Sequence, residues 1–108
     1  MAYEDDEPEF SLTCYLAQQC AEKSLKALLI YYQIEFLYKH ALTYLASLLP
    51  EKEQNFLWGD DDLEWLSDWV TEGRYPGDYL DASDEDAKKA LEIGERIYRY
   101  VLEKVDNL

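Results

Sequence analysis

The chain has 108 residues, 24 of them acidic and 10 basic, which gives a formal net charge of −14 at pH 7. This length suits a single domain, and so negative a chain repels phosphate backbones at long range, which argues against general nucleic-acid binding. No apolar run reaches the roughly 18 residues of a membrane span, and the acidic start is unlike a signal peptide, so we expect a cytoplasmic protein.

The acidic side chains are unevenly distributed along the chain. Residues 1–10 are acidic and lack a helical apolar stripe, so we expect a poorly ordered lead-in. Residues 51–86 hold most of the remaining negative charge, whereas the segments on either side are close to neutral. This acid can serve only to keep the protein soluble, or it can form a surface that docks a basic partner. The neutral segments leave room for a local basic groove.

The first helix is predicted from about Ser11 to Gln33, a stretch without Gly or Pro and rich in good helix formers. Its apolar residues recur in steps of three or four and make a stripe wide enough to face more than one neighbour. Cys14 and Cys20 point to different sides of this helix and cannot bridge each other. We interpret both as small buried hydrophobic residues in a reducing compartment.

Two shorter helices are predicted next. A Leu-rich helix begins at about His40 and is stopped by Pro50, because proline disfavours helical backbone at the residue before it. Residues 51–59 are expected to form a turn with a short helical piece. The acids at residues 60–62 suit the first turn of the following helix, which is predicted to reach about Thr71.

The last helix follows a predicted loop at residues 74–82. Ser83 is a strong helix cap, and the apolar stripe behind it continues to Val105. No stretch alternates between apolar and polar residues in the manner of a strand. The whole chain, residues 1–108, is therefore predicted to be one all-α domain, folded as an antiparallel up-and-down four-helix bundle.

One segment of the first helix carries a family motif. Residues 17–28 read Ala-Gln-Gln-Cys-Ala-Glu-Lys-Ser-Leu-Lys-Ala-Leu. This segment resembles the signature helix of HEPN (higher eukaryotes and prokaryotes nucleotide-binding) domains, whose members read Ala-Gln-Gln-Ala-Ala-Glu-Lys-Ala-Leu-Lys-Ala. The resemblance continues in His-Ala-Leu-Thr-Tyr-Leu from His40 and in Arg-Tyr-Pro from Arg74, in the order of the family. It covers residues 12–105 and implies the same helical bundle.

The chain departs from this family before its signature helix. Family members usually have a full amphipathic helix there, where this sequence has only the acidic lead-in. We expect either that the natural start lies upstream of Met1 or that a second subunit covers the vacant face. The second option agrees with the homodimer that the resemblance implies. It also agrees with the content of 10 tyrosines and 3 tryptophans, since protein interfaces are enriched in aromatic residues.

The resemblance also implies a function. Such proteins are small and prokaryotic and act beside a minimal nucleotidyltransferase, often in a toxin–antitoxin or stress-related pair. A nucleotide or polyanion is expected in a groove beside the signature helix. The residues that we assign as ligand contacts are Lys23, Lys26, His40, Arg74 and Tyr75, and those that line the groove or an interface are Gln18, Gln19 and Glu22.

Each of these residues has a simpler interpretation as well. A lone histidine such as His40 is more often a capping or packing residue than a ligand contact. Arg74 can pin its own loop by pairing with a nearby acid, and the polar side chains of the first helix can form a solvated stripe. An alternative function is therefore a purely protein–protein interaction module, whose acidic surface docks a basic partner.

Catalysis is the least favoured function. Ribonucleases of the HEPN family carry an arginine followed by four to six residues and a histidine. The arginine would hold the phosphate, and the histidine would act as acid or base. The only histidine, His40, precedes every arginine, so this motif is absent. We predict no catalytic residue and no cofactor, and metal-independent ribonuclease activity is the remaining alternative. No second His or Cys falls at a ligand spacing, so we predict no metal site.

Overall fold

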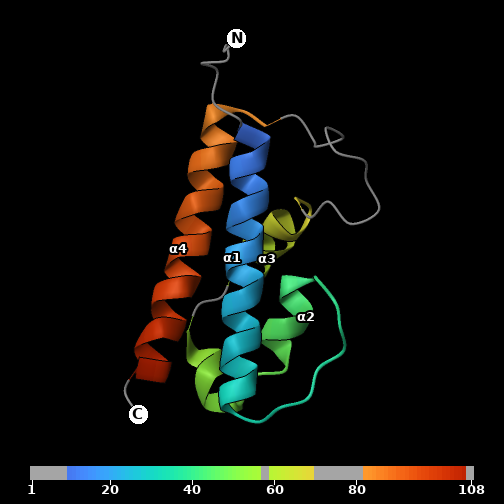
Figure 1. Cartoon of the computed structure of the whole chain (residues 1–108), viewed down its shortest axis with the longest axis vertical. Coiled ribbons are helices and arrows are strands. Elements are labelled where there is room, and N and C mark those ends of the chain that lie inside the picture. The colour runs from blue at the N-terminus through green and yellow to red at the C-terminus, as the bar shows by residue number, and fades with distance from the viewer. Residues whose placement is uncertain (1–9, 57–58, 70–81, 107–108) are drawn as a thin grey trace.

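The structure is a computed structural model that describes residues 10–56, 59–69 and 82–106. Its helices are α1 (Phe10–Tyr31), α2 (Leu42–Ser47), the short 3-10 helix η1 (Glu51–Asn55), α3 (Asp60–Ser67) and α4 (Asp84–Asp106). Figure 1 shows α1 and α4 side by side along the long axis, with α2 and α3 on the other side of α1. No strand occurs in these residues, so the predicted all-α bundle is confirmed.

The ends of two helices follow local signals in the sequence. At the start of α4, the Asp86 backbone N–H donates to the Ser83 hydroxyl at 3.1 Å, and the Ser83 N–H donates to the Asp86 carboxylate at 3.1 Å. This reciprocal cap confirms the predicted helix start. α1 ends at Tyr31, close to the predicted end, and Gln33 then takes left-handed backbone with a φ of 59°.

Some predictions fall on other parts of the chain. Residues 1–9 of the predicted lead-in and loop residues 74–81 lie outside the described residues, whereas Phe10 already begins α1. The prediction that the third helix reaches about Thr71 is wrong, because α3 ends at Ser67. The N–H groups of Asp68 and Trp69 donate to carbonyls three residues back, which tightens the last turn and ends the helix. Within the described residues, none of the helices combines the length and the apolar character that crossing a bilayer requires.

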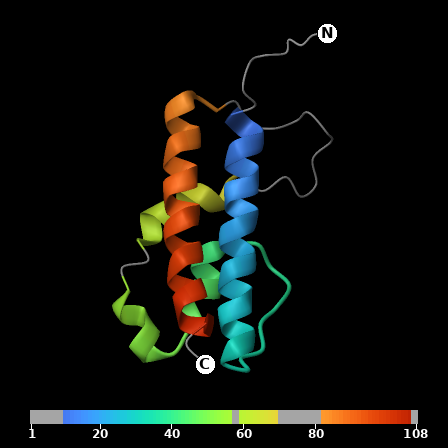
Figure 2. The same ribbon diagram turned by 60° about the vertical axis from the view of Figure 1, so that its left-hand side comes forward.

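The two long helices run in the same direction (Figure 2). Leu16 and Leu91, early in α1 and α4, line one hollow between them, and Ala27 and Val105, late in both helices, line the next. This direction differs from the predicted up-and-down order, in which the first and last of four helices are antiparallel. The reason is that residues 32–41 return along α1 without helical structure, since their bulky side chains lack helical spacing.

The contact between α1 and α4 depends on small side chains. A Cβ atom at Gly94 would lie 3.0 Å from the Ala17 carbonyl oxygen and 3.4 Å from the Ala17 Cβ. Only glycine allows so close an approach of a backbone, and a larger side chain would push the helices apart. The two long helices are therefore held at a short separation where Gly94 meets Ala17.

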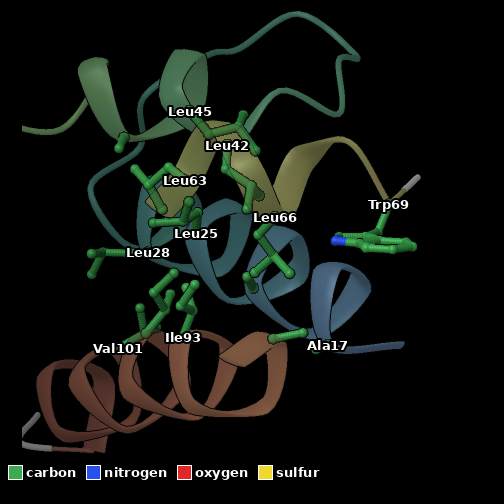
Figure 3. Close-up of a cluster of buried hydrophobic side chains, with 14 of the residues drawn as sticks. Ala17, Leu25, Leu28, Leu42, Leu45, Leu63, Leu66, Trp69, Ile93 and Val101 are labelled. Carbon is green, nitrogen blue, oxygen red and sulfur yellow. The ribbon is translucent and has the colours of Figure 1, made fainter. Parts of the chain in front are cut away.

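The core confirms the wide apolar stripe predicted for α1. This helix lies between α4 on one side and α2 with α3 on the other (Figure 3), so its apolar side chains face both. Cys14 is buried in this core as predicted. The prediction is wrong for Cys20, which is exposed, because it lies at the surface in a hollow between α1 and α4. Core side chains from all four α-helices include Leu25, Leu28, Leu42, Leu45, Leu63, Leu66, Ile93, Ile97 and Val101.

Candidate functional site

A buried carboxylate lies in the middle of α1. Glu22 is only 1% exposed, and its Oε2 lies 2.8 Å from Lys26 Nζ. His40 Nδ1 lies 3.0 Å from both Glu22 oxygens, and Gln18 Nε2 donates to Glu22 Oε1 at 3.1 Å. A buried charge is tolerated only when it is paired and hydrogen-bonded, and these partners meet that need. We call Gln18, Gln19, Glu22, Lys26 and His40 the Glu22 cluster.

The partners of Glu22 fix its protonation state. Burial by itself raises the pKa of this carboxyl, but the hydrogen bonds from Lys26, His40 and Gln18 outweigh it and leave the pKa below its ordinary value. Glu22 is therefore ionised at neutral pH. Because an ionised carboxylate can only accept, the proton of His40 that faces it resides on Nδ1.

The amides of the cluster tie residues 32–41 to α1. Gln18 Nε2 donates to the His40 carbonyl oxygen at 3.3 Å, and Gln19 Nε2 donates to Gln18 Oε1 at 2.8 Å. The spacing of Gln18 and Glu22, one turn apart, thus brings both to His40, and Gln19 joins the cluster through Gln18 and Glu22. Gln18 and Glu22 are buried by this contact, so they form the interior of a polar network rather than an open groove.

The cation of Lys26 is enclosed. The residue is 8% exposed, and Nζ lies 4.5 Å from the centre of the Tyr38 ring and 5.9 Å from that of Phe36. The Tyr38 ring is itself 81% exposed and lies 5.8 Å from the His40 ring. An exposed ring backed by a cation is a surface on which a planar group could stack.

The structure brings together only part of the predicted ligand contacts. Lys26 and His40 meet at Glu22, whereas Lys23 lies on the outer side of α1, beside α4. Arg74 and Tyr75 lie outside the described residues. The predicted ligand site therefore stays a prediction.

A groove between α1 and α4 was not predicted as a site. It consists of two adjoining hollows of about 380 and 290 Å³, which share Cys20 and Tyr98. We call this surface the α1–α4 groove. Its lining comprises Leu16, Ala17, Cys20, Lys23, Ser24, Ala27, Leu91, Gly94, Glu95, Tyr98, Val101, Leu102 and Val105. The Leu12-Leu16-Cys20 row of α1 was the available signal, but in the sequence it could not be told from core.

A second buried carboxylate, Glu53 in η1, was also missed. It is 1% exposed and accepts hydrogen bonds from the hydroxyls of Tyr32 and Tyr100, while Lys104 Nζ lies 3.6 Å away. Burial raises the pKa of Glu53, but the hydrogen bonds from Tyr100 and Tyr32 leave it below its ordinary value. No periodicity marks Glu53, which stands in an acidic segment that looks like a solvated surface.

An acidic cleft lies between α2, η1 and α3. It has a volume of about 560 Å³ and is lined by hydroxyl, amide and carboxylate groups of Thr43, Ser47, Gln54, Asp60 and Glu64, together with Ala46. Asp60 and Glu64 are both exposed. Within the described part of the chain, no group of three or more His, Cys, Asp or Glu side chains could hold a metal ion.

Comparison with known proteins identifies a matching family. A family model described as HEPN domain matches residues 2–105, nearly the whole chain. Neither the curated proteins nor the solved structures give a match.

Proposed function

This chain belongs to the HEPN domain family, and from that premise we propose that it is a non-catalytic accessory module that acts through contacts with other proteins. It works as a homodimer beside a nucleotidyltransferase-type partner, in a pair of the toxin–antitoxin kind. The observation that best supports action through protein contacts is the contrast between the Glu22 cluster and the α1–α4 groove. Lys26 and His40 are engaged by the buried Glu22, whereas the apolar side chains of the α1–α4 groove are exposed.

The homodimer is tested by the mass of the protein in solution. Light scattering across a dilution series is expected to give twice the 12.7 kDa of the chain at high concentration. Dissociation on dilution would then yield the dimer dissociation constant. A single-chain mass at every concentration would overturn the homodimer.

The partner that fits the acidic cleft carries basic side chains. Asp60 and Glu64 line the cleft, and the net charge of −14 attracts cations over a longer range. The double variant Asp60→Asn/Glu64→Gln is expected to bind an arginine-rich peptide about tenfold more weakly than wild type, which corresponds to about 1.4 kcal/mol. Binding is measured by fluorescence anisotropy at several salt concentrations.

The control for the cleft removes the same charge elsewhere. Glu92 and Glu103 are exposed on α4, away from the cleft lining. Glu92→Gln/Glu103→Gln is expected to weaken the peptide only slightly, through the net charge. Equal losses in the two double variants would mean that the peptide responds to overall charge and not to the cleft.

Nucleotide binding is a second candidate function, supported by the exposed ring of Tyr38 between Lys26 and His40. Base stacking on an aromatic side chain contributes about 1–3 kcal/mol. ATP is expected to raise the melting temperature of the wild type, and Tyr38→Ala and Arg74→Ala are expected to lose this stabilisation. No response at millimolar nucleotide would exclude the site.

A further inference from the structure

We infer that the α1–α4 groove is the surface on which a second copy of this chain docks, an inference that rests on the proposed homodimer. The described residues expose nine large apolar side chains, and four of them line this groove. They are Leu16, Leu91, Tyr98 and Leu102, which are between 39% and 55% exposed. Scattered apolar residues are ordinary on a protein surface, but a contiguous set marks an interaction site.

The spacing of the apolar residues that line the groove suits packing against a helix. Along α4, Leu91, Tyr98 and Val105 recur every seven residues, which is the spacing of a seam that packs against another helix. The intramolecular contact with α1 uses a different row, which includes Ile93 and Ile97. α4 therefore carries a second seam, in which Leu91 and Tyr98 are exposed and Val105 is partly buried against the core.

The charge of the groove favours a second copy of this chain over a basic partner or a polyanion. Among its lining residues only Lys23 and Glu95 are charged, so the groove has no net charge in a protein of −14. Two copies repel each other through their net charge, and this repulsion is smallest when the surfaces in contact are neutral, as this groove is. A basic partner is drawn instead to the acidic segment, and a polyanion finds a single lysine. A second copy presents the same apolar, neutral surface.

The test compares charge insertion inside and outside the groove. Leu16→Glu and Leu91→Glu each place a carboxylate in the groove, and each is expected to raise the dimer dissociation constant at least 100-fold in light scattering. The control is Leu37→Glu, because Leu37 is 61% exposed but lies outside the groove lining. It is expected to leave the dissociation constant unchanged. Far-ultraviolet circular dichroism checks that each variant stays helical.

The outcomes separate this inference from the homodimer itself. A wild-type dimer that both groove variants leave intact would overturn the docking surface while the homodimer stands. A wild-type monomer at all concentrations would overturn both. A wild-type dimer that Leu37→Glu disrupts as strongly as the groove variants would place the interface elsewhere.

Cys20 reports on the same surface independently. Cys20 is exposed and lines both hollows of the groove. Cys14 is buried, and burial together with the Asp86 charge raises the pKa of the Cys14 thiol to about 11, so Cys14 does not compete for the label. Maleimide labelling of Cys20 is therefore expected to slow at least tenfold as the protein concentration passes through the dissociation constant. In Leu16→Glu it is expected to stay fast. A labelling rate that does not change while the mass doubles would overturn the inference.

Discussion

A Glu22→Gln protein is expected to lose about 3–5 kcal/mol of its free energy of unfolding, because breaking a buried ion pair leaves the remaining charge without its counter-ion. Lys26 lies 2.8 Å from Glu22 and is 8% exposed, so water cannot readily replace the carboxylate. Glutamine keeps the volume of the side chain and one acceptor oxygen, so the loss reports mainly the charge. Urea unfolding followed by circular dichroism measures the difference.

The control and the pH dependence test that origin. Glu92→Gln removes an exposed glutamate of α4 and is expected to change stability by less than about 0.5 kcal/mol. The folded-state pKa of Glu22 lies below its ordinary value of 4.5. Its contribution is therefore fully present above pH 4.5 and is lost as the pH falls through the folded-state pKa. Wild type and Glu22→Gln are expected to converge in strong acid, and a constant difference would contradict a charge-based effect.

Local signals predicted the helices well, since apolar spacing, the cap at Ser83 and the stop at Pro50 act within a few residues. The relative direction of the long helices could not be predicted in this way. The lack of helical spacing in residues 32–41 can be read from the sequence, but the return of this segment along α1 depends on its contacts with that helix. The contacts between Tyr38 and Lys26 and between His40 and α1 join positions that are distant in the sequence.

The candidate site was predictable only along one helix. Helical spacing places Gln18, Glu22 and Lys26 one turn apart, and the structure confirms this row. Lys23 was grouped with Lys26 because both are cations of the signature helix, but it lies on the outer side, beside α4. The pairing of Glu22 with His40 spans 18 residues of sequence, so it needed the fold to be seen.

A Glu53→Gln protein is expected to lose a similar free energy of unfolding, about 3–5 kcal/mol, because the partners of this buried carboxylate lose its charge. A hydrogen bond to a charged group contributes about 1.5–3 kcal/mol, and the carboxylate accepts one from Tyr32 and one from Tyr100. Lys104 Nζ, at 3.6 Å, also loses its counter-ion. Glu53 belongs to η1, while Tyr32 directly follows α1 and Tyr100 and Lys104 belong to α4. Loss of the carboxylate is therefore expected to release η1 from both long helices. Urea unfolding gives the magnitude.

An alkaline titration separates this network from simple loss of packing. The hydrogen bond to Glu53 raises the pKa of Tyr32 from 10.0 to about 12. Its contribution to stability is therefore fully present below pH 10 and is lost as the pH rises through about 12. In Glu53→Gln, tyrosine absorbance is expected to show Tyr32 ionising near pH 10. Tyr32→Phe is expected to remove part of the stability and this delayed titration together. Tyr38→Phe, which alters an exposed ring, should change neither, and if it does, the assignment of the delayed titration to the Glu53 network is wrong.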